Sequence, residues 1–178
     1  QGLDEASVGL VMSIGPVIGA LGGVPAGWAV DRLGARFIAI TGLVEMAIGA
    51  VAMTMLPSIF GVPGYIASIM ALVPGYVLFQ TANNSAVMTG IRPEDRGVTS
   101  GLLNLSRNLG LFTGASVMGA MFAYGAGTSD ISTVSGEAVA AGLQVTFEVA
   151  AALIILAIAL IAGSQAVAGR SVSSSGTL

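Results

Sequence analysis

The sequence predicts an all-α membrane protein, a polytopic helix bundle that crosses the bilayer about five times. Of its 178 residues, 54% are hydrophobic and only 8% are charged, and the mean hydropathy is +0.91. This leaves too little polar surface to cover a water-soluble globule of this size. The apolar residues also gather into five runs, each of the roughly 20 residues needed to cross a hydrocarbon layer about 30 Å thick.

Each apolar run is expected to form a helix, because backbone polar groups in lipid must be satisfied within the segment. No run alternates as the strands of a membrane barrel do. The third run is interrupted by Pro74 and by a polar stretch at 80–85. A Ser-rich tail at 169–178 is expected to be disordered. The predicted helices lie near residues 8–30, 37–56, 64–89, 98–124 and 140–166, within a membrane domain at 1–168.

The basic residues indicate the orientation, and all six are arginines. If the first helix runs inward, five of the six fall on one side, and the opposite connections hold only acidic charges. By the positive-inside rule the arginine side is the cytoplasm. We therefore expect a multi-pass protein of the bacterial inner membrane with a cytoplasmic C-terminus. The five arginines are Arg32, Arg36, Arg92, Arg96 and Arg170.

Cysteine and histidine are both absent. Their absence removes disulfides, thiolate chemistry, His-based catalysis and most transition-metal sites, so the sequence predicts no enzyme, no metal site and no cofactor. A net charge of −3 argues against nucleic acid as a partner, because phosphate binding needs clustered cations. The chain begins at Gln1 with no signal-peptide pattern, so we interpret it as a piece of a longer protein.

Two motifs carry a family resemblance. Residues 27–36, Gly-Trp-Ala-Val-Asp-Arg-Leu-Gly-Ala-Arg, follow the pattern Gly-x-x-x-Asp-Arg-x-Gly-x-Arg. This stretch resembles the signature loop between the second and third helices of each half in the major facilitator superfamily, although Ala35 stands where the family usually has a basic residue. Residues 91–110 resemble the loop and eleventh core helix of fourteen-helix drug:proton antiporters. The five helices then look like core helices eight to twelve, the C-terminal half without its first helix.

The resemblance implies a carrier that works by alternating access, in which two six-helix halves rock about a central cavity and protons drive the efflux of amphipathic or cationic drugs. Its implied partners are the lipid bilayer, the N-terminal half missing from this sequence, a small-molecule substrate and protons. Two alternatives stay open. One is a metabolite transporter, for a sugar or an organic acid. The other is a non-transporting scaffold of five helices, which would need no water-accessible cavity.

The charged loop is the first candidate site. In the family, the acid that matches Asp31 is thought to lean on the positive N-terminal end of a helix in the other half. By the pseudo-symmetry of the fold, Arg36 is expected to reach Glu94 or Asp95 and to latch one conformation. The alternative is a set of solvated charges that mark a helix boundary. The residues of this latch loop are Gly27, Asp31, Arg32, Gly34, Arg36, Glu94 and Asp95.

Polar side chains inside the apolar runs form the second candidate site, a substrate or proton pathway. Arg107 is costly in lipid unless it is paired, meets water or snorkels to the interface. A carboxyl group among apolar residues holds its proton more readily, so Glu45 and Glu148 are candidates for proton exchange or for attracting a cationic drug, unless Glu148 meets water directly. The alternative role of the glutamine and asparagine side chains is to form hydrogen bonds between helices. The full set is Glu45, Gln80, Asn84, Asn104, Arg107, Asn108, Gln144 and Glu148.

Glycines spaced four residues apart predict close helix packing. Gly15, Gly19 and Gly23 line one face of the first helix, since residues i and i+4 are neighbours, and small residues let backbones approach. Gly110 and Gly114 repeat the pattern on the fourth helix. A hinge during transport is the alternative role.

Overall fold

The computed structural model of the chain describes residues 4–127 and 135–174, without the side chains of Glu5 and of 162–174. Every element in these ranges is a helix, and five of them are long and apolar enough to cross a membrane, which confirms the predicted all-α bundle. The elements are α1 (Glu5–Leu33), α2 (Ala35–Phe60), α3 (Val62–Met88), the short 3-10 helix η1 (Pro93–Asp95), α4 (Arg96–Ala126) and α5 (Gly136–Ser174).

Single glycines connect the first three helices. Gly34, at φ 88°, separates α1 from α2, and Gly61, at φ 63°, separates α2 from α3. Glycine adopts a positive φ without the steric cost that a Cβ brings, so the chain can reverse within one residue. The prediction that these charged residues form a loop is therefore wrong. Asp31 and Arg32 form the last turn of α1, and Arg36 lies in the first turn of α2.

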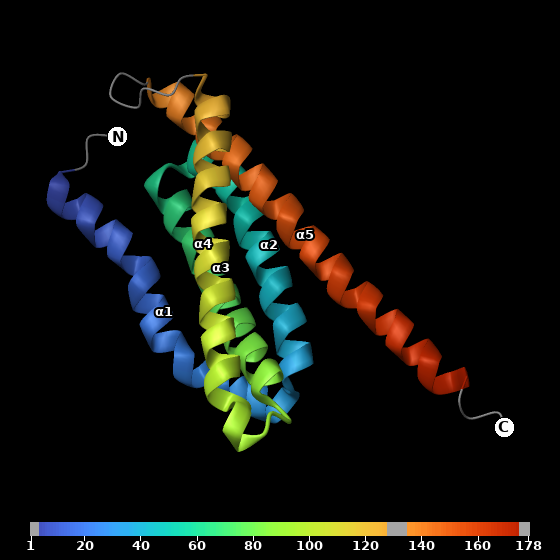
Figure 1. The fold of residues 1–178 in the computed structure, drawn as a ribbon. Coiled ribbons are helices and arrows are strands. Elements are labelled where there is room, and N and C mark those ends of the chain that lie inside the picture. The colour runs from blue at the N-terminus through green and yellow to red at the C-terminus, as the bar shows by residue number, and fades with distance from the viewer. Residues whose placement is uncertain (1–3, 128–134, 175–178) are drawn as a thin grey trace.

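The helices alternate in direction through the bundle (Figure 1). The α1–α2 and α3–α4 connections lie at one end, and the α2–α3 connection lies at the other, beside the start of α5. The arginines at 32, 36, 92 and 96 consequently share one end of the bundle. This arrangement agrees with the topology from which the positive-inside orientation was predicted.

Helices α2 and α3 pack backbone against backbone. A Cβ built on Gly42 would lie 2.6 Å from the carbonyl oxygen of Gly75 and 2.6 Å from the backbone nitrogen of Phe79. A Cβ on Gly49 would lie 2.6 Å from the Cα of Leu72. Such close approach is how helices gain packing energy in lipid, where the hydrophobic effect does not draw them together. The α2–α3 pair forms the centre of the bundle.

The other helices attach around this pair. Helix α1 packs on α3, and α5 packs on both α2 and α4. The α4–α5 contact also uses glycine, since a Cβ on Gly142 would lie 2.8 Å from the carbonyl oxygen of Phe122. Helix α4 crosses in front of α3 in Figure 1 but touches it only sparsely. Polar side chains occupy the space that this sparse contact leaves.

The glycine pattern predicted from the sequence does not hold these helices together. Among the five predicted packing positions, only Gly15 is close to another helix, with its Cβ position 3.8 Å from Cγ2 of Val73. A Cβ would meet nothing within 4 Å at Gly19, Gly23, Gly110 or Gly114. Close packing at these four positions is thus wrong for the described chain, and it stays a prediction only for a partner outside it.

Helix α5 is longer than the sequence predicts. It continues to Ser174, past the expected end near 166, and so includes residues 169–174 of the predicted disordered tail. No proline between 162 and 174 interrupts the backbone hydrogen-bond ladder. Residues 175–178 lie outside the described part of the chain.

Candidate functional site

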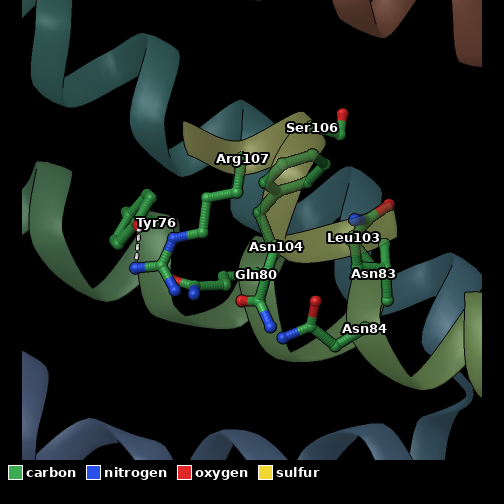
Figure 2. Close-up of a pocket in the computed structure, with 9 residues that line it drawn as sticks. Tyr76, Gln80, Asn83, Asn84, Leu103, Asn104, Ser106 and Arg107 are labelled. Carbon is green, nitrogen blue, oxygen red and sulfur yellow. Dashed lines mark hydrogen bonds between the residues drawn. The ribbon is translucent and has the colours of Figure 1, made fainter. Parts of the chain in front are cut away.

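A polar pocket of about 230 Å³ opens between α3 and α4 (Figure 2). It lies between two helices that touch each other only sparsely, and both contribute uncharged polar groups to its wall. Arg107 is the one charged residue that lines it in the described part of the chain. The lining residues are Tyr76, Phe79, Gln80, Asn83 and Asn84 from α3, with Leu103, Asn104, Ser106 and Arg107 from α4.

The guanidinium of Arg107 reaches from α4 to α3. Its Nη2 donates a hydrogen bond to the hydroxyl oxygen of Tyr76 at 3.3 Å. With the Gln80 amide oriented by its hydrogen-bond network, Oε1 of Gln80 accepts from Nη1 at 2.8 Å and from Nη2 at 3.2 Å, while Nε2 donates to the Tyr76 oxygen at 2.8 Å. Tyr76 and Gln80 share a helix face because they are four residues apart. The three side chains form a closed triangle across the two helices.

Arg107 lies far from both ends of α4. It is eleven residues after Arg96, so its Cα is about 16 Å along the helix, and it is nineteen residues before Ala126. A hydrocarbon layer about 30 Å thick and centred on this helix would therefore enclose Arg107 well inside its boundaries. Tyr76 is twelve residues before the end of α3 at Met88, and the helices are antiparallel, so Tyr76 is at a similar depth. The guanidinium extends sideways to the Tyr76 hydroxyl and the Gln80 amide on α3.

The asparagines divide between the pocket and the outer surface. Asn84 and Asn104 line the pocket, and their amides point toward one another in Figure 2. Asn108 does not line it, and its side chain is exposed. It follows Arg107 by one residue, which on a helix rotates it by about 100° away from the direction of the guanidinium. Asn108 therefore does not share this pocket, and its place in a substrate or proton pathway stays a prediction.

Glu45 is half-buried in a different place. It lines a second pocket, of about 350 Å³, where α1, α2 and α3 meet. Among the residues that the structure describes, it is the only ionisable group of that pocket, and its neighbours there include Pro25, Trp28 and Pro74. The predicted pathway is thus divided, with the carboxylate of Glu45 and the guanidinium of Arg107 in separate pockets.

Gln144 and Glu148 are paired, as their four-residue spacing allows. Nε2 of Gln144 donates to Oε1 of Glu148 at 2.9 Å, and both side chains are exposed on α5. Gln144 lines a third pocket, of about 360 Å³, beside Glu137 and Tyr65, whereas Glu148 does not. The expectation that both point into one cavity is not met by Glu148.

The charged end of the bundle lacks the predicted latch. Arg36, Glu94 and Asp95 are exposed, and no Arg–carboxylate pair within 4.0 Å joins them in the part of the chain that the structure describes. Exposed charges gain little from pairing in water, so sequence proximity to the same membrane face does not bring them together. Arg32 instead lies over the ring of Trp28, 5.1 Å from its centroid, in a cation–π contact.

Sequence reasoning missed the residue that holds Arg107. Tyr76 lies in an apolar stretch and was not among the predicted site residues, although its four-residue spacing to Gln80 places both on one helix face. The same spacing argument identified Gln80 with Asn84. Extending it by one turn would have found Tyr76. The same spacing relates Phe79 to Asn83 on α3 and Leu103 to Arg107 on α4, and Ser106 completes the wall.

Comparison with known proteins places these features in a family context. The sequence profile of the Major Facilitator Superfamily matches residues 1–115. The chain is 29% identical over 120 residues to the uncharacterized transporter YebQ of Escherichia coli, covering 67% of this chain and 26% of that protein. It is 26% identical over 121 residues to the multidrug efflux pump LfrA of Mycolicibacterium smegmatis, covering 68% and 24%. The chain thus spans about a quarter of the length of these relatives. No solved structure is significantly similar to it.

Proposed function

Because this chain belongs to the Major Facilitator Superfamily and is thus part of a multi-pass membrane transporter, we propose that it works in proton-coupled efflux of amphipathic compounds. Its five helices form the larger part of the C-terminal half of a longer carrier, which operates by alternating access. The similarity to LfrA, a multidrug efflux pump, supports export over uptake.

The observation that carries this proposal is the polar α3–α4 pocket around Arg107. Ionisable groups inside membrane spans are costly and mark substrate or ion pathways. A scaffold of five helices has no need of a guanidinium at this depth or of amides that face an opening. The pocket therefore favours transport over a purely structural role.

Each polar feature takes a separate part in this mechanism. The α3–α4 pocket holds polar groups of the cargo. Glu45 exchanges the proton, since it is the only ionisable group in the pocket where three helices meet. Asp31 and Arg36, at the cytoplasmic end, engage the other half of the carrier in one of its conformations. The open glycine faces of α1 and α4 pack against that half.

The test is transport by the full-length carrier in inverted membrane vesicles. Three pyrene probes of matched size serve as cargo: pyrenebutyrate, pyrenebutanol and pyrenebutyl-trimethylammonium, which are anionic, neutral and cationic. At least one probe should accumulate above the level of vesicles without the protein, and a protonophore should collapse the accumulation. Absence of accumulation for all three, with the carrier inserted, would contradict the proposal.

A further inference from the structure

The positive charge of Arg107 is not neutralised within the described chain. Its three hydrogen-bond contacts go to two uncharged oxygens, of Tyr76 and Gln80. A guanidinium carries five N–H donors and stays protonated in proteins, so at least two donors remain for another acceptor. A full charge at this depth is poorly balanced by neutral acceptors alone. The pocket is therefore set up to accept a negative group.

The rest of the pocket agrees with this reading. No acidic residue within the described ranges 4–127 and 135–174 lines it. The Tyr76 oxygen already accepts from Arg107 and Gln80, so the phenolic proton is directed elsewhere and can be donated. The amides of Asn84 and Asn104 add further N–H donors at the same wall. A cation placed here would face Arg107 without any compensating carboxylate.

The size of the pocket indicates what part of a ligand it holds. Drug-sized ligands occupy sites of about 300–1,000 Å³, whereas this pocket has about 230 Å³. It can take a charged group with a short apolar stem, and half-buried Phe79 and Leu103 offer apolar surface for that stem. The guanidinium donors that remain free can make charge-assisted hydrogen bonds to a carboxylate.

We infer that the α3–α4 pocket binds the carboxylate of an amphipathic cargo molecule, with Arg107 as its charge partner and with Tyr76 and Gln80 as residues that position the guanidinium. This inference rests on the proposed function and narrows it. It assigns organic anions and zwitterions to the carrier, and it disfavours the cationic drugs that the family resemblance implies.

The experiment measures binding of the three pyrene probes to the purified full-length carrier by fluorescence anisotropy. The wild-type protein should bind pyrenebutyrate about 10-fold more tightly than pyrenebutanol, the effect expected of hydrogen bonds to a charged group. Arg107→Gln should remove this preference, so that pyrenebutyrate binds no more tightly than pyrenebutanol. The matched control is Arg92→Gln, which removes an exposed arginine outside the pocket and should retain the wild-type preference.

A second variant keeps the inference falsifiable if Arg107→Gln does not fold. Arg107→Lys retains the charge and loses the planar fork, so it should keep a reduced preference for pyrenebutyrate. Equal wild-type binding of the anionic and neutral probes would overturn the inference, as would an unchanged preference in Arg107→Gln. A carboxylate side chain from elsewhere in the carrier could occupy the pocket instead. In that case Arg107→Gln would lower the melting temperature without changing probe binding, which also overturns the cargo assignment.

The vesicle assay separates this inference from the proposed function. Protonophore-sensitive accumulation of a probe, together with no preference for the anion in binding, would refute only the carboxylate site. A clear anion preference that depends on Arg107, together with no accumulation of any probe, would refute only the transport proposal.

Discussion

Gly42 on α2 and Gly75 on α3 occupy the space that each other's side chain would need. A Cβ on Gly42 would lie 2.6 Å from the carbonyl oxygen of Gly75, and a Cβ on Gly75 would lie 2.7 Å from that of Gly42. Both contacts are to backbone, which cannot move aside as the end of a side chain can. The separation of the two central helices is therefore limited by this pair.

Replacing Gly75 with alanine should destabilise the carrier. Overpacking costs about 1–3 kcal/mol, and the clash with α2 outweighs the gain of up to about 1 kcal/mol in helix propensity. The measurement is thermal unfolding of the full-length carrier in detergent. Gly119→Ala is the control, because a Cβ there meets nothing within 4 Å. We expect a lower melting temperature for Gly75→Ala alone, and equal stability of the two variants would disprove the packing argument.

Tyr76 and Gln80 should be energetically coupled. Tyr76→Phe removes the oxygen that accepts from both Gln80 and Arg107, and Gln80→Leu removes the other acceptor of the guanidinium. A double-mutant cycle on unfolding should give a coupling of about 0.6–2 kcal/mol, the range for hydrogen bonds between membrane helices.

The control for this cycle pairs Tyr76→Phe with Ser116→Ala, since the Ser116 hydroxyl donates to the carbonyl of Phe112 within its own helix. Those two changes should be additive. Additivity of Tyr76→Phe with Gln80→Leu as well would contradict the hydrogen-bonded triangle.

Glu45→Gln should uncouple transport from the proton gradient. The variant keeps the shape of the side chain and cannot release a proton, so protonophore-sensitive accumulation should fall at least 10-fold while exchange of labelled for unlabelled cargo persists. Inverted vesicles measure both activities. Glu148→Gln should behave as wild type, because Glu148 is exposed and lines none of the three pockets described above. If Glu148→Gln lost protonophore-sensitive accumulation and Glu45→Gln kept it, proton exchange would instead be assigned to α5.

Asp31→Asn should slow transport without preventing insertion. Asp31 is exposed at the end of α1, so its loss removes no contact that holds the described helices together. We expect a transport rate reduced about 10-fold at an unchanged protein level in the membrane, which immunoblotting would verify. Asp4→Asn, at the opposite end of α1, is the matched control. A wild-type rate for Asp31→Asn would reject a role of this end in gating.

Composition was sufficient to predict the bundle, because the bilayer itself imposes helices of a set length. Composition was less accurate in predicting the connections between the helices. The predicted helices leave 31–36 and 57–63 as connections, whereas Gly34 and Gly61 each reverse the chain in one residue. A positive φ at glycine is a property of the folded backbone, and the hydropathy of the neighbouring residues does not report it.

The sequence predicted which site residues share a face of one helix, but not which residues of different helices contact one another. Four-residue spacing placed Gln80 with Asn84 on one face, and the cost of a charge in lipid identified Arg107. The contact of Arg107 with Tyr76 depends on how α3 and α4 lie against each other, which a pattern along one helix does not contain. The glycine pattern failed for the same reason, since Gly42 and Gly75 belong to different helices and share no repeat.

The single-residue joints at Gly34 and Gly61 leave no slack between the first three helices. One residue spans at most about 3.6 Å, which is less than the 5.4 Å rise of one helical turn. Helix α1 therefore cannot slide past α2 by a full turn unless a helix end unwinds. A change in the tilt of α1 relative to α2 must instead occur by rotation about the backbone at Gly34, whereas α4 is joined to α3 by a longer stretch of chain.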